Sequence, residues 1–412
     1  MNITFNPILE KLSLSLGAPV YIVGGYIRDF IAFNTLSKDV DICAPVDQNT
    51  LIKKSQELGM KVLAEYKTTG TVKLCYDSDV FEFSPFRVEK YPKKSGAHTP
   101  IAVKPTNSVK KDAMRRDFKC NAVYYDVLNK KIVDPLNGLK DIKTKRLDTV
   151  ISPNKVFSRD GLRIIRLARF SAKTGFVPTR ATIKSAKRHA LLLKDVTKER
   201  IREEINQILS LDNEMVFIGL KTLLKTFATR FVLNNSFEPN DNLLKLISNA
   251  KKDFRIFAFC LVFSNNIENA IINASNLKFS KKEFSTFKSI CTLLKTAFDN
   301  NRKEIDTLLL IADNYTQASD CVFIIKEIIK LDTFNDNKKQ TANQFINLVN
   351  RFEKENLPKT EKDLDLTAKE LLTIGIKGEN VRKTQRFLLS KCILDPTLND
   401  KNRLLNLLKT LT

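Results

Sequence analysis

Three acidic residues near the start of the sequence have the spacing of a metal site. Asp39 and Asp41 are separated by one residue in the strand-like segment KDVDIC. Because side chains alternate along a strand, both carboxylates face the same side. A third acid, Glu82, lies in the apolar segment VFEFSPF, which can form a neighbouring strand. Paired carboxylates bind hard divalent cations, and two Mg²⁺ ions serve an in-line phosphoryl displacement.

A glycine pair precedes these acids. Gly24 and Gly25 end a predicted strand and begin a predicted helix in the segment VYIVGGYIRDF. Glycine lets the backbone approach a bulky anion, and the free N–H groups at the start of the helix point toward it. An isolated Asp-x-Asp is more often a solvated strand end. Its combination with Gly-Gly, with Arg28 and with Glu82 favours a metal site beside a bound phosphate.

The sequence predicts a sheet that positions these residues. Segments rich in Val, Ile, Phe and Tyr predict strands at 20–23, 40–43, 71–76, 80–86 and 122–125, with helices at 26–33 and 49–58. After Phe157 the strand signals fade and apolar residues recur at helical spacing. We expect an α+β head with a mixed sheet, followed by an extended all-α region. The predicted domains are a head over 1–150, a neck over 151–210, a helical body over 211–345 and a helical tail over 346–412.

Composition excludes several classes of protein. Lys and Arg number 69 against 46 Asp and Glu, and the net charge of +23 favours nucleic acid over the weaker option of an acidic membrane. The two histidines, His98 and His189, are too few for a multi-His zinc centre. Seven scattered cysteines without a C-x-x-C pair indicate a reducing compartment, so we expect a cytoplasmic protein. No apolar run approaches the ~20 residues of a membrane span, and no signal peptide is expected.

Several further motifs share an order and spacing with one enzyme family. They are MRRDFKCNA at 114–122, DPLNGLKD at 134–141, DGLRIIRLARF at 160–170 and ERIREE at 199–204. Together with the glycine and aspartate motifs, they resemble the nucleotidyltransferase superfamily headed by DNA polymerase β. Within it, they are similar to the class of CCA-adding tRNA nucleotidyltransferases and bacterial poly(A) polymerases.

The resemblance implies a template-independent enzyme that adds C and A residues from CTP and ATP to the 3′ end of tRNA. Asp39 and Asp41 would coordinate Mg²⁺, with Glu82 as a third catalytic acid near the priming hydroxyl. The glycine pair and Arg28 would belong to the nucleotide site.

Two other motifs supply the expected nucleotide contacts. Arg115 and Arg116, ahead of an acid, suit a triphosphate clamp. The resemblance implies that Asp117 and Asn121 bind the ribose hydroxyls. A surface arginine pair beside a capping residue is the competing interpretation.

The neck is expected to read the base. In the family, the counterparts of Asp160 and Arg163 act as a protein template for the incoming nucleotide. Asp160 would accept from the exocyclic amine of cytosine or adenine, and Arg163 would donate to the ring atom beside it. A buried acceptor left unpaired by guanine or uracil costs about 1–3 kcal/mol. Arg166 and Arg169 follow at three-residue steps, as further nucleotide contacts or as a solvated basic stripe.

Two departures from the family pattern bear on specificity. The family's Glu before the base-reading Asp, which orients the arginine, is Arg159 here, and a neighbouring acid is left open as its substitute. The loop at 87–100 contains GAHTP in place of the family's acidic and Arg-Arg/His-Pro groups. Since that loop helps to switch addition from C to A, the second departure bears on A addition.

The C-terminal region favours tRNA as the substrate. Residues 366–378, LTAKELLTIGIKG, resemble a segment of CCA-adding enzymes, and the tail lacks the Arg-rich block of poly(A) polymerases. We expect the acceptor arm to lie along the basic neck and body through phosphate contacts, with the tail also binding tRNA. The alternatives are a poly(A) polymerase, a partial CC- or A-adding enzyme, and a non-catalytic RNA-binding relative.

Overall fold

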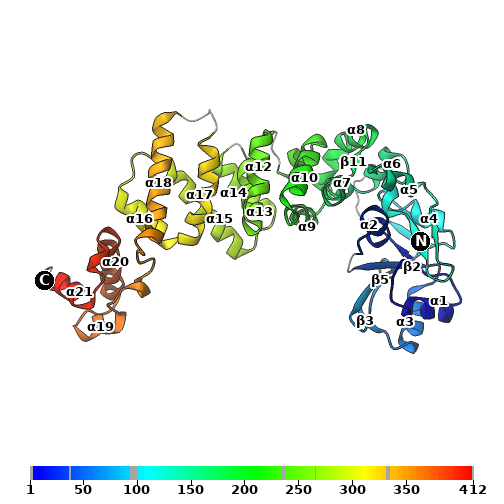
Figure 1. Ribbon diagram of the computed structural model, residues 1–412, viewed down its shortest axis with the longest axis horizontal. Coiled ribbons are helices and arrows are strands. Elements are labelled where there is room, and N and C mark those ends of the chain that lie inside the picture. Colours follow the sequence, from blue (N-terminus) through cyan, green and yellow to red (C-terminus); the bar gives the residue numbers. More distant parts are fainter. Residues whose placement is uncertain are drawn as a thin grey trace. The chain divides into compact units, whose positions relative to one another are not determined.

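The computed structural model describes residues 3–36, 39–92, 100–233, 237–264, 266–330 and 335–410. The chain divides into two compact units, Met1–Ser248 and Asn249–Thr412. Figure 1 shows a mixed sheet with helices in the first unit and helices in the second. The expected fold class, an α+β head followed by helices, is therefore confirmed. The finer division into head, neck, body and tail stays a prediction.

A seven-stranded sheet forms the core of the first unit. Its strand order is β3-β4-β5-β2-β1-β8-β9. The β2–β5 pair is parallel, whereas the other neighbouring strands are antiparallel. The strands are β1 (Tyr21–Val23), β2 (Val40–Ala44), β3 (Lys61–Tyr66), β4 (Thr71–Tyr76), β5 (Asp79–Pro85), β8 (Tyr124–Asp126) and β9 (Lys131–Val133).

The apolar pattern of the strands explains which face is buried. Ile22, Ile42, Leu74, Phe81 and Phe83 are no more than 1% exposed. They alternate along β4 and β5 with polar residues, which is the pattern of strands with one face on an apolar core. The other face of these strands is left for polar side chains.

Short helices flank the sheet. They are α1 (Ile8–Leu16), α2 (Gly25–Phe33), α3 (Gln48–Glu57), α4 (Val109–Ala113), the 3₁₀ turn η1 (Lys119–Asn121) and α5 (Gly138–Lys143). The predicted helices at 26–33 and 49–58 correspond to α2 and α3. The Asp47 carboxylate accepts hydrogen bonds from the first free N–H groups of α3, which fixes where that helix begins.

Two further strand pairs lie outside the main sheet. The antiparallel hairpin β6 (Arg87–Lys90) and β7 (Ala102–Pro105) follows β5 directly. The short strands β10 (Arg146–Leu147) and β11 (Val177–Pro178) pair in parallel. The sequence pattern predicts neither pair.

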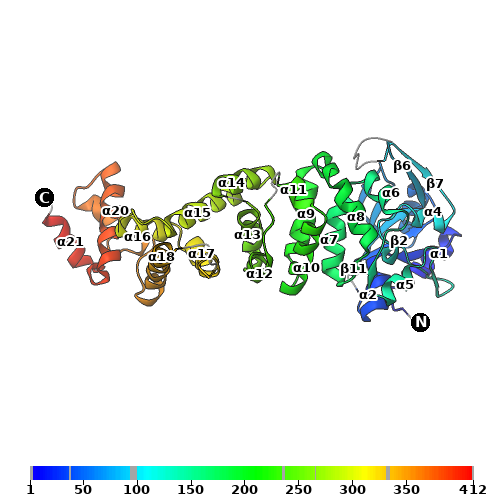
Figure 2. The same ribbon diagram turned by 90° about the horizontal axis from the view of Figure 1, so that it is seen from above.

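The rest of the first unit is helical. Its helices are α6 (Pro153–Arg159), α7 (Leu162–Thr174), α8 (Arg180–His189), α9 (Lys198–Leu209), α10 (Asn213–Lys225), α11 (Ala228–Val232) and α12 (Asp241–Asn249), with the 3₁₀ turn η2 (Ala190–Asp195) between α8 and α9. Figure 2 shows α7, α9 and α10 side by side. Gly219 of α10 allows this packing, since a Cβ there would lie 2.5 Å from the Ile208 side chain.

The second unit is a stack of helices. They are α13 (Arg255–Val262), α14 (Ile267–Asn276), α15 (Lys281–Ala297), α16 (Glu304–Asp313), α17 (Tyr315–Ile328), α18 (Asp336–Lys354), α19 (Ala368–Thr373), α20 (Glu379–Leu394) and α21 (Lys401–Lys409). Helices α15, α17 and α18 pack against one another (Figure 1). Phe257, Phe279 and Phe287 form an aromatic cluster with ring centroids 5.7–5.8 Å apart. Within the described residues, no single helix meets the length and hydropathy of a membrane span, and only one bent pair, Lys252–Val262 with Ile267–Asn276, meets them jointly.

Candidate active site

Three carboxylates lie on the polar face of the sheet. Asp41 of β2 and Glu82 of β5 are direct neighbours in the parallel strand pair. Asp39 immediately precedes β2, and strand periodicity places it on the same face as Asp41. The neighbours Phe81 and Phe83 are buried on the opposite side. The parallel pairing thus brings together acids that lie far apart in the sequence.

The glycine turn between β1 and α2 approaches these carboxylates closely. Gly24 has φ 80° and ψ −136°, a conformation that side chains disfavour. A Cβ at this position would lie 2.8 Å from Oδ2 of Asp41. Only glycine therefore fits between β1 and the Asp41 carboxylate. Gly25 begins α2, so its backbone N–H is at the free end of that helix.

The environment of Asp41 suits a cation. Its pKa is raised to about 6, chiefly by burial and to a smaller extent by Glu82 and Asp39, against the opposing effect of Arg116. Within the described residues, no group of three or more His, Cys, Asp or Glu side chains is arranged to hold a metal ion. Glu82 therefore does not complete a preformed three-ligand site with the two aspartates. Crowded, oxygen-only donors nevertheless match the ligand preference of Mg²⁺.

All of the predicted site residues line one cavity. Its volume is about 930 Å³, and it extends from β2 and β5 to α7. The predicted residues that line it are Gly24, Gly25, Arg28, Asp39, Asp41, Glu82, Arg115, Arg116, Asp117, Asn121, Asp160, Arg163, Arg166 and Arg169. The fold thus gathers residues from widely separated parts of the first unit.

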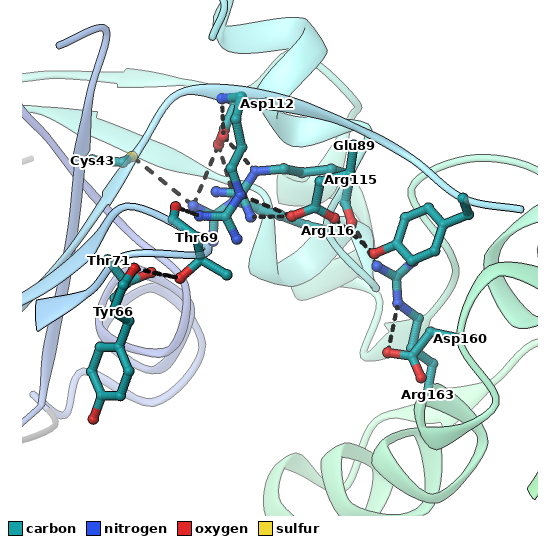
Figure 3. Close-up of polar contacts among 12 residues, drawn as sticks. Cys43, Tyr66, Thr69, Thr71, Glu89, Asp112, Arg115, Arg116, Asp160 and Arg163 are labelled. Atoms are coloured by element: carbon teal, nitrogen blue, oxygen red, sulfur yellow. Dashed lines mark hydrogen bonds and ion pairs between the residues drawn. The ribbon is translucent and has the colours of Figure 1, made fainter. Parts of the chain in front are cut away.

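The arginine pair is anchored by an acid that the motif analysis did not single out. Arg115 Nε donates to Oδ1 of Asp112 at 2.7 Å, and Arg116 Nε lies 3.4 Å from Oδ2 of the same carboxylate (Figure 3). The hydroxyl of Tyr124 also donates to Asp112 at 2.8 Å. Burial acts to raise the pKa of Asp112, but the two arginines hold it below the ordinary value. One buried carboxylate therefore fixes both guanidinium groups.

Asp117 is held by an arginine of α7. Its Oδ2 accepts from Nε of Arg166 at 3.0 Å and from Nη2 at 2.6 Å. Its Oδ1 accepts from the Phe118 N–H at 2.8 Å and from the Asn121 amide at 3.3 Å. Burial acts to raise the pKa of Asp117, but the nearby guanidinium outweighs it and holds the pKa well below its usual range. Asp117 is thus a fixed, ionised acceptor.

Arg28 is completely buried and supports its neighbours. Its Nε donates to Asp29 at 2.8 Å, and its Nη1 donates to Oδ1 of Asn121 at 2.6 Å. The guanidinium also lies 5.4 Å from the centre of the Phe170 ring. Arg28 therefore orients the amide of Asn121 from beneath the cavity.

The predicted base-reading residues lie at the start of α7. Oδ1 of Asp160 accepts from the Leu162 N–H at 3.0 Å. Nη2 of Arg163 donates to the main-chain carbonyl of Arg115 at 2.8 Å, and its Nε lies 3.9 Å from Oδ2 of Asp160 (Figure 3). Two buried guanidinium nitrogens, Nη1 of Arg163 and Nη2 of Arg115, have no hydrogen-bond partner in the described part of the chain. Such donors match a polar or anionic ligand.

Arg166 and Arg169 do not form a solvated basic stripe, so that alternative is wrong. Arg169 Nε lies 2.7 Å from Oε2 of Glu204, and Arg166 Nη1 lies 3.6 Å from Oε1. Arg166 also binds Asp117. Glu204 of α9 thus joins the two arginines into a network at the back of the cavity.

The two departures from the family pattern lie near the hairpin. Arg159 ends α6 and lines a second cavity of about 520 Å³ with residues of β6 and β7. Within the loop at 87–100, the segment 93–99, which contains Gly96 and His98, lies outside the described residues.

The main cavity is also lined by residues that the sequence analysis did not predict as site residues. They are Thr69, Lys73, Arg87, Glu89, Tyr91, Lys173 and Arg200, among others. Lys73 had a usable signal, because strand periodicity in β4 places it opposite the buried Val72 and Leu74. Asp112 had none, since it is recognised only as the partner of two arginines, whereas Glu204 ends the motif at 199–204 and Glu89 lies in the loop at 87–100, but neither was expected as a site residue.

The amino-acid sequence is similar to that of known proteins. Residues 20–148 match the protein family described as "Poly A polymerase head domain", and residues 175–226 match "Probable RNA and SrmB- binding site of polymerase A". The CCA-adding enzyme of Staphylococcus saprophyticus is 26% identical over 99% of this chain and 98% of its own length. That of Bacillus subtilis is 27% identical over 98% and 97%. The chain is thus similar to CCA-adding enzymes over nearly its whole length, and its head matches the poly(A) polymerase head domain.

Solved structures of the family share the fold. The crystal structure of the Bacillus stearothermophilus CCA-adding enzyme with CTP superposes with a TM-score of 0.71 at 20% identity, covering 100% of this chain and 99% of the other. The Thermotoga maritima CCA-adding enzyme complexed with tRNA superposes with a TM-score of 0.66 at 17% identity, covering 98% and 94%. The match to the poly(A) polymerase head domain also implies a divalent metal ion.

Proposed function

We propose that this protein is a tRNA nucleotidyltransferase that adds C and A residues to the 3′ end of tRNA. It would use CTP and ATP, and each addition would release pyrophosphate. The observation that carries the proposal is the single cavity in which carboxylates, an anchored arginine pair and a base-reading pair lie together. The similarity to CCA-adding enzymes over nearly the whole chain supports it.

Asp39 and Asp41 would hold Mg²⁺ on the polar face of the sheet. The bound ions would lower the pKa of the tRNA 3′-OH and neutralise charge on the leaving pyrophosphate. Glu82, one strand away from Asp41, would face the priming hydroxyl. The close approach of Gly24 to Asp41 would keep this carboxylate at a fixed distance from the phosphates.

Arg115 and Arg116 would bind the triphosphate. Both are held by Asp112, so little conformational freedom is lost when a nucleotide binds. The unpartnered Nη2 of Arg115 is a ready donor to a phosphate oxygen. Asp117 would accept hydrogen bonds from the ribose hydroxyls. Asn121, which Arg28 orients, would donate to them.

Asp160 and Arg163 would select the base. Cytosine and adenine each present an amine donor beside a ring acceptor, and this pair presents the complementary acceptor and donor. Uracil and guanine reverse the pattern and leave buried groups unpaired. Arg166 and Arg169 would act through the network with Asp117 and Glu204.

The basic surface would hold the tRNA. A net charge of +23 attracts a polyanion, and the contacts would fall mainly on phosphates. The tail over 346–412 would contribute to this binding.

Three tRNA transcripts test the proposal. They end at the discriminator base, after one C and after CC, and each is incubated with Mg²⁺ and one labelled nucleotide at a time. We expect stepwise addition of C, C and A followed by a halt, read at single-nucleotide resolution. A halt after CC would indicate a partial enzyme, and an unlimited A ladder a poly(A) polymerase. No product on any transcript would leave only an RNA-binding relative.

A further inference from the structure

Arg163 forms only a long ion pair with a carboxylate in the described part of the chain. Its side chain is only 9% exposed, yet the Asp160 carboxylate lies 3.9 Å from its Nε, beyond hydrogen-bond distance. Among the described residues, the Arg163 side chain makes one hydrogen bond, the 2.8 Å contact from its Nη2 to the Arg115 carbonyl. The residue before Asp160 is the cation Arg159, which cannot orient a guanidinium. The hydrogen bond to Arg115 is therefore the shortest contact that holds Arg163.

A buried acid on the β6–β7 hairpin lies close to this arginine. The side chain of Glu89 is 8% exposed and accepts from Arg87 Nε at 2.8 Å. Its other oxygen accepts from the Tyr91 hydroxyl at 2.7 Å, and Arg115 Nη1 lies 3.7 Å from the carboxylate. Figure 3 places Glu89 between Arg115 and the Asp160–Arg163 pair. The hairpin can therefore influence the position of Arg163 in two ways.

The first route runs through the main chain of Arg115. Its side chain binds Asp112 at one end and faces Glu89 at the other. These contacts fix the position of the carbonyl that accepts from Arg163. Glu89 therefore determines where the guanidinium of Arg163 lies, although it does not touch it.

The second route runs through the hydroxyl of Tyr91. This hydroxyl has one proton, which it donates to Glu89. Its lone pairs are then left for a cationic neighbour. Tyr91 lines the same cavity as Asp160 and Arg163. The Tyr91 hydroxyl is thereby left as an acceptor in the cavity, and Nη1 of Arg163 is a buried donor without a hydrogen-bond partner among the described residues.

We propose that Glu89 and Tyr91 are positioning residues that orient Arg163 for base selection, in the place that an acid before Asp160 would otherwise take. The inference rests on the proposed function, since it assumes that Arg163 reads the base. Cytosine offers a ring acceptor to a donor from Arg163, whereas uracil offers an N–H at that position. A guanidinium that is free to swing away would tolerate uracil. The two residues therefore control accuracy more than rate.

The test compares CTP with UTP on a tRNA transcript that ends at the discriminator base. The variants are Tyr91→Phe, Glu89→Gln and the double variant, and kcat/KM is measured for each nucleotide. We expect the CTP-over-UTP ratio to fall by about tenfold in each single variant, within the range that one base contact contributes. The double variant should fall no further, because both residues act through Arg163.

Tyr315→Phe is the matched control. It removes a tyrosine hydroxyl that donates to a glutamate at 2.8 Å in the second unit, so it repeats the chemistry of Tyr91→Phe away from the cavity. Its CTP-over-UTP ratio should equal that of the wild type. If Glu89→Gln fails to fold because two arginines lose their partner, Tyr91→Phe still decides, since it leaves the carboxylate in place.

The outcomes separate the two proposals. If the wild type adds neither nucleotide, the proposed function fails. If the wild type adds C but the variants lower kcat/KM equally for CTP and UTP, the hairpin is only structural and the inference is overturned. A selective gain of U incorporation supports it.

Discussion

At the scale of single residues, the site depends on side chains that neighbours leave no freedom to move. Asp112 fixes two arginines, and Arg28 fixes Asn121. Among the acids expected to bind metal, Asp41 is half-buried, and Asp39 and Glu82 are exposed. Contacts made before a nucleotide binds reduce the entropy lost on binding.

Gly24→Ala should reduce nucleotide transfer about a hundredfold while the protein stays folded. The added Cβ would lie 2.8 Å from the Asp41 carboxylate, and φ 80° would be strained. Displacement of a catalytic group by about 1 Å is expected to cost about a hundredfold in kcat. Steady-state CTP addition measures this loss. Gly17→Ala is the control. Gly17 has φ 60° with open space around it, so this substitution introduces backbone strain without a steric clash. Equal activity of the two variants would contradict the role of Gly24.

Asp39→Ala and Asp41→Ala should each abolish transfer while tRNA binding stays nearly intact. Loss of a metal ligand is expected to reduce kcat by about a thousandfold or more, which equals ~4 kcal/mol of transition-state stabilisation. Chelation of Mg²⁺ should have the same effect on the wild type. Filter binding of tRNA and pyrophosphate release are measured side by side.

Asp79→Ala is the matched control for the two aspartates. Asp79 begins β5 and accepts from Asn6 at 2.8 Å, outside the cavity. It should keep wild-type transfer. Wild-type turnover in either Asp39→Ala or Asp41→Ala would show that the metal assignment is wrong.

At the scale of elements, α7 is held by ion pairs to the segment between α4 and η1 and to α9. Arg166 of α7 binds Asp117, and Glu204 of α9 binds Arg166 and Arg169. This network fixes the helix that carries Arg163 against the residues expected to bind ribose. Stability and base selection therefore depend on the same contacts.

Asp117→Asn should lower the free energy of unfolding by about 3 kcal/mol at pH 7, the lower end for a broken buried pair because Arg166 is 33% exposed. The pKa of Asp117 is depressed in the folded protein. Its contribution is therefore present above the unfolded-state pKa, about 3.9, and is lost as the pH falls below it. Denaturant unfolding of both proteins between pH 7 and 3 measures the difference. A gap that stays constant over this range would refute the ion pair's role.

Local patterns predicted the elements that carry apolar runs and missed those that do not. The runs at 20–23, 40–43, 71–76 and 80–86 became β1, β2, β4 and β5 within a residue or two. The polar β6–β7 hairpin and the edge strand β3, whose residues are mostly exposed, gave no such signal. Predicting them requires knowledge of which strand lies beside them.

The same distinction holds within the site. Asp39 and Asp41 were found because period two is a local property of a strand. Glu82 lies beside Asp41 because of the parallel register of β2 with β5, and no local pattern in the sequence predicts that register. Partners such as Glu89 for Arg115 are set by tertiary packing alone. The motifs thus identified the residues that would touch substrate, and the fold identified those that hold them.

At the scale of the whole molecule, charge dominates the expected behaviour. The excess of basic residues is spread over both units, with 69 Lys and Arg in total. A long RNA can therefore contact many cations at once, whereas a nucleotide contacts only those in the cavity.

Binding of tRNA should weaken steeply with salt. A protein that makes 6–10 phosphate contacts loses about 10³–10⁵ in affinity for duplex DNA between 50 and 200 mM salt, and the expected loss for tRNA is about 10²–10⁴. Fluorescence anisotropy of labelled tRNA over this range measures the slope. CTP binding is the internal comparison and should change far less. A flat salt dependence for tRNA would contradict phosphate-dominated binding.

The strand order of the sheet also has a consequence during synthesis of the chain on the ribosome. Strand β1 lies between β2 and β8, and its partner residues Tyr124–Asp126 follow about 100 residues later. At about 5–20 residues per second, the strand that carries the glycine turn waits roughly 5–20 s with one edge unpaired. Such an edge can pair with other chains. The nascent head would thus pass through a period in which it needs protection from aggregation, and it could not act on nucleotides until α7 had also left the exit tunnel.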